Sequence, residues 1–406
     1  MITYEVKLKK IGEMTTLPDS QRLFGFLINF SKQYCPEEEI ISTFVKGVKE
    51  QEQKCMISSM FPTGYYPMPK AYVIQKLQKK LNENQEKITS EEKKQIDLRK
   101  EIESFIQTLL EKNELAKKEK TKKEKDKIKR QIAGLELKLE KKKNEFNQLA
   151  TEINNLSTKN IYETIKGMDF IKQNELKEIL NLTEKNEKIS VEVLKNRQYI
   201  KKKQTFIQKF RLENQIRELP GMPNVAYALP ILSFENQEGE IQKEFSFFVR
   251  APKESCLAKG LVGMQTSLQN HDIPCFLGAK GSSGYNEYQI YSVEVLNEQE
   301  SKDVRNIAYL NLGVLLPNFD NIDVEHSFLD IYTSDRKPFE IENEVPKVIS
   351  FVTAGSVIQV KDNGTDLYQV GKSIDNSKYN PLYKKNAIIF GNAYLIGLEA
   401  SNEASF

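Results

Sequence analysis

The stretch that decides the architecture is IKRQIAGLELKLEKKKNEFNQLATEINNL, residues 128–156. Two series of residues recur in it with a period of seven: Ile128, Leu135, Lys142, Leu149 and Leu156, and Ile132, Leu139, Phe146 and Ile153. All members except Lys142 are apolar. Two interleaved apolar series of this period are typical of a helix that packs in a coiled coil.

A weaker repeat of the same period lies upstream. One series is Ile74, Leu81, Ile88, Gln95, Ile102 and Leu109, and the other includes Leu77, Leu98 and Phe105, with Asn84 and Glu91 as polar interruptions. Both arms flank a short polar turn, so antiparallel pairing is the simplest arrangement, and no proline interrupts them between Pro69 and Pro220. We therefore predict an antiparallel coiled-coil hairpin over residues 76–158, with arms of roughly 50 to 60 Å at about 1.5 Å rise per residue.

The turn between the arms is strongly basic. Residues 112–130, which we call the basic tip, hold ten Lys+Arg and four Asp+Glu. Such a run either keeps the end of a hairpin in water or contacts nucleic acid or a partner protein. The sequence leaves both interpretations open.

The sequence outside the hairpin mixes strands and helices. Residues 2–9 alternate between apolar and polar residues like a half-buried strand, and Asp19 or Ser20 is expected to cap a helix, with a second helix over 37–50. After the hairpin, residues 226–234 and 244–252 are apolar and flank a polar turn, so we predict a β-hairpin in a second sheet. The fold class that follows is α+β.

Composition limits the function classes. The net charge is only +3, so any nucleic-acid surface must be local. Cys35, Cys55, Cys256 and Cys275 follow no metal spacing and are expected to be reduced, buried thiols, and His271 and His326 lie in no metal-binding array. We predict no metal, no cofactor and no catalytic constellation. The absence of a signal-peptide-like or membrane-spanning run favours a cytoplasmic location.

The sharpest local motif is a glycine-rich loop within FLGAKGSSGYNEYQI, residues 276–290. Its candidate RNA-binding residues are Gly278, Lys280, Gly281, Ser282, Ser283, Gly284 and Tyr285. Glycines let backbone amides approach a phosphate, the lysine and serines add donors, and the tyrosine is expected to stack on a base or to pack under the loop. The motif lacks the Gly-Lys-Ser/Thr ending of a Walker loop, and an ordinary β-turn is the alternative.

Two further places offer phosphate contacts. Arg211 and Asn214 lie close together in RLENQIREL, residues 211–219, where the alternative is surface salt bridges. Lys70 follows two prolines and is expected to contact phosphate or to solvate the end of a strand.

Five stretches, taken in order, carry a family resemblance. They are PDSQRLFGFLINF (18–30), MISSMFPTGYYPMPK (56–70), RLENQIREL, the glycine-rich loop, and FVTAGSVI (351–358) with NPLYKKNAIIFGNAYLIGL (380–398). With them the chain resembles the repeat-associated (RAMP) subunit that caps the 5′ end of the guide RNA in type III-A CRISPR (Csm) effector complexes. The hairpin is not part of that family's common core. The loop's usual last glycine is Asn286 here, and asparagine tolerates a positive φ better than most residues.

The resemblance implies two ferredoxin-like (RRM-like) RAMP domains with the hairpin inserted. The first would comprise residues 1–75 and 159–204, and the second residues 205–406. The chain would be a non-catalytic subunit in antiviral defence that holds the repeat-derived 5′ tag of the crRNA, through the loop residues, Arg211, Asn214, Lys70 and also Arg22. Its protein partners would be the large polymerase-like subunit and a backbone RAMP subunit of the complex.

Three alternatives stay open. The first is the equivalent subunit of a type III-B complex. The second is a RAMP-fold crRNA-processing endoribonuclease, although such enzymes usually use a histidine near the first helix and the first 270 residues here hold none. The third is a coiled-coil scaffold protein, which would dimerise through its hairpin.

Overall fold

The chain forms two compact units. The structure, a computed structural model, describes residues 1–182, 189–210, 226–296, 308–333, 349–361, 366–375 and 388–398. The globular unit comprises Met1–Tyr72, Met168–Lys177 and Gln198–Phe406, and the helical unit comprises Val73–Gly167 and Glu178–Arg197. In the part of the chain that is described, no helix is long and apolar enough to cross a membrane.

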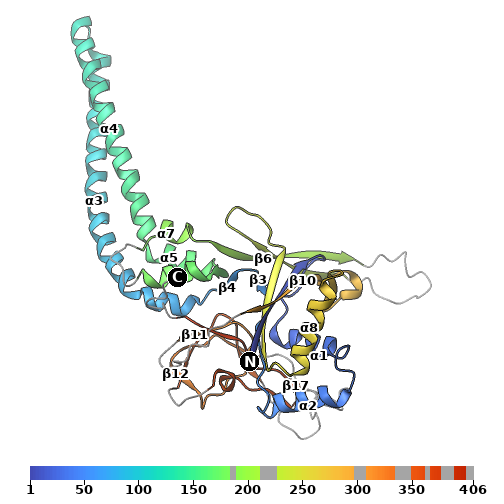
Figure 1. Cartoon of the computed structure of the whole chain (residues 1–406). Coiled ribbons are helices and arrows are strands. Elements are labelled where there is room, and N and C mark those ends of the chain that lie inside the picture. The colour runs from blue at the N-terminus through green and yellow to red at the C-terminus, as the bar shows by residue number, and fades with distance from the viewer. Residues whose placement is uncertain are drawn as a thin grey trace. The chain divides into compact units, whose positions relative to one another are not determined.

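The main sheet of the globular unit has the N-terminal strand at its centre. Strand β1 (Ile2–Lys10) pairs antiparallel with β8 (Glu244–Ala251) on one side and with β10 (Glu287–Leu296) on the other (Figure 1). The outer strands are β9 (Ile273–Phe276) beside β10, and β2 (Met56–Ile57) and β3 (Phe61–Pro62) beside β8. Because one face of β1 meets the core, Tyr4, Val6 and Leu8 are buried, as the alternation predicted.

Two helices that follow strands of this sheet pack against each other. Helix α1 (Ser20–Ser31) begins at the Asp19 carboxylate, which accepts a hydrogen bond from the Arg22 backbone N–H at 2.9 Å, as the capping prediction required. Helix α8 (Cys256–Leu268) approaches α1 so closely that a Cβ on Gly260 would lie 2.3 Å from the Ser31 hydroxyl. Helix α2 (Glu38–Lys49) occupies the predicted second helix.

A second sheet of the globular unit has the order β4-β5-β6-β7. Its strands are β4 (Tyr65–Pro67), β5 (Phe170–Lys172), β6 (Tyr199–Phe210) and β7 (Ala226–Glu235). The predicted hairpin of residues 226–234 with 244–252 was wrong: a turn joins β7 to β8, but β7 pairs with β6 along its whole length and β8 pairs with β1. Strand pairing depends on partners distant in sequence, which a turn signal does not identify.

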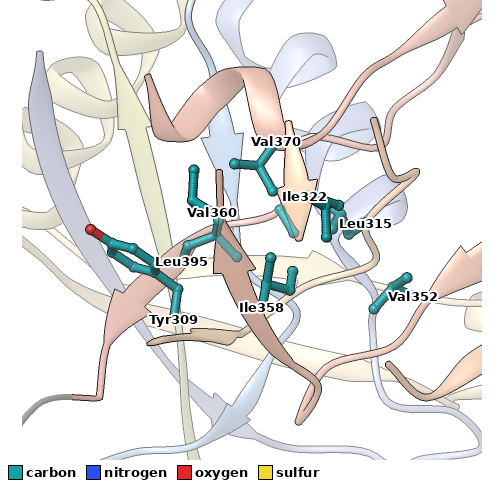
Figure 2. Packing of buried hydrophobic residues seen from close by; sticks show 9 residues of the cluster. Tyr309, Leu315, Ile322, Val352, Ile358, Val360, Val370 and Leu395 are labelled. Carbon is teal, nitrogen blue, oxygen red and sulfur yellow. The ribbon is translucent and has the colours of Figure 1, made fainter. Parts of the chain in front are cut away.

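The C-terminal part of the globular unit is a third sheet with its own core. Its order is β12-β15-β11-β18, from β12 (Ile322–Phe328), β15 (Val357–Val360), β11 (Ala308–Asn311) and β18 (Leu395–Gly397). Figure 2 shows the apolar side chains that gather here, among them Tyr309, Leu315, Ile322, Ile358 and Leu395. Two short pairs complete it, β13 (Ile331–Thr333) with β14 (Ser350–Val352) and β16 (Ile374–Asp375) with β17 (Ile388–Ile389).

Residues 57–62, ISSMFP, of the stretch quoted above join the first and third sheets. The Ile57 N–H donates to the Asn392 carbonyl at 3.1 Å, and the Ser58 hydroxyl accepts from the Phe248 N–H at 2.8 Å. A Cβ on Gly313 would lie 2.7 Å from the Ile57 carbonyl oxygen. This close approach of three chain segments gives the motif a structural role.

The helical unit consists chiefly of two long antiparallel helices, α3 (Lys70–Lys118) and α4 (Lys122–Leu156) (Figure 1). Two contacts fix their register: Lys112 Nζ to Gln131 Oε1 at 2.7 Å and Lys142 Nζ to Glu101 Oε2 at 3.2 Å. The shorter helices are α5 (Thr158–Lys166) and α7 (Val191–Lys195), while α6 (Gln173–Asn181) runs from one unit into the other.

Burial along α3 and α4 follows the predicted seven-residue series. Leu81, Ile88, Leu98 and Leu109 are buried, and the series residues of α4 are buried or half-buried among exposed neighbours. Asn84, which interrupts the repeat, is only 2% exposed because its Nδ2 donates to the Ile189 carbonyl at 2.7 Å. A polar residue in the seam is therefore satisfied from within the same unit.

The expected division into residues 1–75 with 159–204 and residues 205–406 stays a prediction. Residue 204 lies inside β6, and β1 pairs with β8 and β10 of the second range. The hairpin residues 76–158 all lie in the helical unit.

Candidate nucleic-acid interface

The glycine-rich loop is a closed turn between β9 and β10. Its ends are joined by a hydrogen bond from the Leu277 N–H to the Asn286 carbonyl at 3.0 Å, and a short 3₁₀ turn, Gly281–Ser283, forms its tip. Lys280, Gly284 and Asn286 have φ values of 64°, 77° and 56°. Three left-handed residues in seven make the chain fold tightly on itself.

Asn286 anchors this loop to the segment after β1. Its Oδ1 accepts from the Thr15 N–H at 2.9 Å, and its Nδ2 donates to Thr15 Oγ1 and to the Ala279 carbonyl, both at 2.8 Å. The side chain is fully buried. Its φ of 56° agrees with the expectation that asparagine tolerates a positive φ at this position, and its amide makes bonds that glycine would lack.

Gly12 lets the anchoring segment approach the loop. A Cβ at this position would lie 2.4 Å from the Gly284 carbonyl oxygen, which is far inside van der Waals contact. The sequence prediction did not single out Gly12, since its role depends on a residue distant in the chain.

Tyr285 packs beneath the loop. It is only 7% exposed and forms an apolar cluster with Leu229 and Ile231 of β7. Of the two expectations for Tyr285, packing is therefore what the structure shows, and the buried ring is not presented to a base.

The exposed part of the loop carries the phosphate-binding chemistry that was predicted. Lys280, Ser282, Ser283 and Gly284 are exposed, and Gly281 is half-buried. An ammonium group, two hydroxyls and a glycine backbone thus lie within five consecutive residues at the exposed end of the loop. Such a set can hold phosphate oxygens through charge and hydrogen bonds.

Phe276, which the sequence prediction missed, lies beside this surface. Its ring is 53% exposed on β9, and a Cβ on Gly281 would lie 3.1 Å from its Cδ1. Stacking of an unpaired base requires an exposed aromatic ring, and here the ring lies next to hydrogen-bond donors that can bind the adjoining phosphate. The sequence offered no signal for this exposure, because β9 reads IPCF and has no polar side chain that would mark its exposed face.

Arg22 reaches the same region from α1. Its Nη1 donates to Thr16 Oγ1 at 2.6 Å, and the adjacent Thr15 binds Asn286. Its positive charge also lies close enough to Tyr288 to oppose the rise in the pKa of that phenol that burial causes. Arg22 is thus brought next to the loop's anchor.

The remaining candidates have other positions. Lys70 Nζ forms an ion pair with Asp169 Oδ1 at 2.8 Å, and Asp169 Oδ2 accepts a hydrogen bond from the Lys202 N–H at 2.8 Å. Through Asp169, Lys70 therefore connects the start of α3 to strand β6 of the second sheet. Arg211 and Asn214 lie outside the residues that the structure describes.

Strand β6 carries three consecutive lysines that the sequence prediction did not single out. Lys201, Lys202 and Lys203 are all exposed, although Lys203 pairs with Glu235. Ile207 is paired directly with Leu229, so it lies on the same face as the Tyr285 cluster. A run of three lysines inside a strand of β-branched and aromatic residues was the available signal.

Possible metal ligands and free cysteines occur among the residues that the structure describes. These residues contain no group of three His, Cys, Asp or Glu side chains that could hold a metal ion. All four cysteines are free and buried, as predicted, and burial raises the pKa of Cys256 to about 11 and that of Cys275 to about 12. Neutral, buried thiols are poor nucleophiles.

Comparison with known proteins yields distant structural likenesses. No family model and no curated protein sequence matches the chain. A chain of the Csm3-Csm4 subcomplex in the type III-A CRISPR-Cas interference complex is similar over 97% of this chain and 98% of its own, with 12% identity and a TM-score of 0.46. A chain of the Csm1-Csm4 cassette in complex with cA4 is similar over 99% of this chain and 100% of its own, with 12% identity and a TM-score of 0.42. These are subunits of the kind of complex that the sequence resemblance names.

Proposed function

We propose that the chain is a non-catalytic crRNA-binding subunit of a type III-A CRISPR-Cas effector complex, in which the glycine-rich loop holds the repeat-derived 5′ tag of the crRNA. The observation that carries this proposal is the loop itself: Asn286 fixes its base by three side-chain hydrogen bonds, while Lys280, Ser282 and Ser283 remain exposed at its tip. A fixed base and an exposed tip give a pre-formed surface for an anion.

The mechanism combines phosphate binding with base stacking. Lys280 supplies charge, and the serine hydroxyls and loop amides supply donors to phosphate oxygens. Because Tyr285 is buried, Phe276 takes the stacking role, since its ring is exposed beside Gly281. Stacking on an aromatic side chain is worth about 1 to 3 kcal/mol per base.

The fold proposal follows the order of elements around β1. The succession β1, α1, β2 with β3, β8, α8 and β10 is that of a ferredoxin-like βαββαβ domain with a long insertion between its middle strands. We propose that the C-terminal sheet belongs to a second domain of this type and that α3 and α4 form a coiled-coil hairpin. The insertion between β3 and β8 accounts for the pairing of β1 with β8 and β10, which lie in the expected second domain.

The protein partners to test are those that the resemblance implies. We propose that the subunit bridges the large polymerase-like subunit and a backbone RAMP subunit. Co-expression with the corresponding neighbours, which the similar structures name Csm1 and Csm3, provides the assay. Recovery of a complex that contains short RNAs with one constant 5′ segment is the expected result.

The loop's role is tested by RNA binding to the purified chain. Two oligonucleotides of equal length and composition, one with the tag at its 5′ end and one with the tag scrambled, are compared by fluorescence anisotropy. We expect Lys280→Ala with Ser282→Ala and Ser283→Ala to weaken tag binding about tenfold or more, because charged hydrogen bonds contribute about 1.5 to 3 kcal/mol each. Phe276→Ala should cost about fivefold or more.

The control is Lys259→Ala, which removes an exposed lysine from α8 without touching the loop. Unchanged tag binding in the loop variants would contradict the proposal. Cleavage of repeat RNA by the wild-type chain would favour the endoribonuclease alternative, and an RNA-free homodimer would favour the scaffold.

A further inference from the structure

The charges of the helical unit are divided unevenly between the shaft and the tip of the two long helices. The shaft, residues 73–111 and 131–156, holds twelve Lys+Arg and twelve Asp+Glu. The basic tip, residues 112–130, holds ten Lys+Arg and four Asp+Glu. A net charge of +6 is therefore concentrated where α3 gives way to α4.

Ion pairing differs in the same way. On the shaft, at least five of the twelve basic side chains have carboxylate partners, for example Lys94 with Glu91 at 2.7 Å, Arg99 with Glu103 at 3.2 Å and Lys142 with Glu101 at 3.2 Å. Throughout residues 112–130, all of which the structure describes, no lysine or arginine lies within 4.0 Å of a carboxylate oxygen of another described residue. The basic and acidic residues of the shaft balance each other, whereas the net positive charge of the tip is available to a partner molecule.

Lys117 and Lys118 lie in the last turn of α3, where the helix dipole favours cations, but the lysines at the start of α4 do not stabilise their helix. Lys122, Lys123 and Lys125 stand in the first turn of α4, where the helix dipole is positive and each cation costs about 0.3 to 1 kcal/mol. The connection is nevertheless ordered, because Glu119 Oε1 accepts from the N–H groups of Lys120 and Thr121 at 3.0 and 3.2 Å. Residues that cost stability while remaining exposed are better explained by binding than by folding.

The residue types of the tip select the ligand. It contains no aromatic side chain, so it cannot stack on unpaired bases. It has one arginine and one exposed large apolar side chain, Leu115, whereas protein interfaces depend on clusters of aromatic and arginine anchors. Lysines distributed on two helix ends suit the dense, regular phosphates of a duplex.

We propose that the basic tip is a second nucleic-acid site of this chain, which binds the phosphate backbone of double-stranded nucleic acid without sequence preference. It belongs to the helical unit, and the glycine-rich loop belongs to the globular unit. The two sites use different chemistry: the loop combines a phosphate contact with an exposed ring, and the tip uses charge alone. The site does not depend on the tag-binding role proposed for the loop.

The test uses the full chain and three labelled probes of about 24 nucleotides or base pairs: duplex DNA, duplex RNA and single-stranded polythymidine. Anisotropy titrations are repeated between about 50 and 200 mM salt. The tip variant replaces six exposed lysines by glutamine: Lys117, Lys118, Lys120, Lys122, Lys123 and Lys125. The matched control makes the same change at six exposed lysines of the shaft: Lys79, Lys87, Lys93, Lys138, Lys141 and Lys143.

We expect the tip variant to bind duplex at least about tenfold more weakly at low salt. The dependence of its log affinity on log salt should be shallower by about 0.9 for each phosphate that the variant no longer neutralises. The control variant should stay within about twofold of wild type. Similar weakening on duplex DNA and duplex RNA would show backbone binding, and weakening on one alone would identify the source of the duplex. Helicity measured by circular dichroism verifies that both variants are folded.

Equal duplex affinity in the tip and control variants would overturn the proposal. So would a preference of the wild-type chain for the single strand, or retention by the tip variant of the full salt dependence. If the tip variant binds tagged RNA normally while the loop variant binds duplex normally, the two sites are independent. Failure of the loop proposal would leave the duplex result unchanged.

Discussion

The glycine-rich loop and the helical shaft are specified in opposite ways. Each residue of the shaft is fixed by neighbours three or four positions away and by one repeating series, so errors at single positions are tolerated. The loop is fixed by residues far away in the sequence: Asn286 binds Thr15, and Gly284 rests against Gly12. A repeated local rule builds the rod, whereas a few long-range contacts build the candidate site.

The largest expected effect on this contrast comes from removing the loop's anchor. Asn286→Ala leaves the Thr15 N–H and the Ala279 carbonyl buried without partners and also places alanine at a φ of 56°. We expect a loss of about 2 to 4 kcal/mol in the stability of the globular unit, measured by urea unfolding. Asn286→Gly should lose about 1 to 2 kcal/mol less, because only the backbone strain is relieved. Equal losses in the two variants would show that strain contributes nothing.

A smaller loss is expected from Gly12→Ala. The added methyl would meet the Gly284 backbone, which cannot rotate away, so overpacking should cost about 1 to 3 kcal/mol. Thermal unfolding followed by tyrosine absorbance is a suitable measurement. Gly25→Ala is the control, since a Cβ there meets nothing within 4 Å. A destabilisation by Gly25→Ala equal to that by Gly12→Ala would contradict the role of close approach.

On the shaft, two polar positions of the same repeat should respond in opposite directions. Asn84→Ala removes the partner of the Ile189 carbonyl and should destabilise the helical unit by about 1 to 2 kcal/mol. Gln95→Leu extends the apolar seam and should be neutral or stabilising by up to about 1 kcal/mol. The measurement is the thermal loss of helicity at the far-ultraviolet helix band. Stabilisation by Asn84→Ala would mean that the hydrogen bond contributes nothing to stability.

The smallest expected effect is a difference in how the stability of the globular unit and that of the shaft depend on pH. Burial raises the pKa of Cys275 to about 12 from an ordinary value of 9.0, so the unfolded chain loses that proton first and stability falls as pH rises above about 9. One such thiol accounts for about 1 kcal/mol at pH 10. Residues 73–156 contain no cysteine or tyrosine, so the shaft should not share this loss. Cys275→Ala should make the dependence shallower by that amount; the same slope in that variant would assign it to other groups with raised pKa values, such as Cys256.

Features governed by local chemistry could be predicted from the sequence. The seven-residue series placed the buried side of α3 and α4, Asp19 was identified as a possible cap of α1, and asparagine at position 286 was expected to accept a positive φ. The polar interruption at Asn84 was noticed, but its partner Ile189 was not, because 105 residues separate them. Periodicity contains no information on such a contact.

The candidate site shows the same limit. Its exposed members, Lys280, Ser282 and Ser283, were identified from residue type alone. Residue type alone could not show which of the two nearby rings, Phe276 or Tyr285, faces solvent. Tyr285 is buried by Leu229 and Ile231, which belong to a strand that was assigned to a different hairpin. Once β7 pairs with β6, Tyr285 is covered and Phe276 is the ring left exposed.

Because β1 lies at the centre of the main sheet, this sheet cannot form until late in synthesis on the ribosome. This strand emerges early, yet both of its neighbours, β8 and β10, lie beyond residue 243. At about 5 to 20 residues per second, roughly 10 to 50 seconds pass between translation of β1 and of its first neighbour. By the end of that interval the long helices are complete and can pair locally, while β1, which has one apolar face, still has both edges unpaired, a state that favours chaperone binding and aggregation.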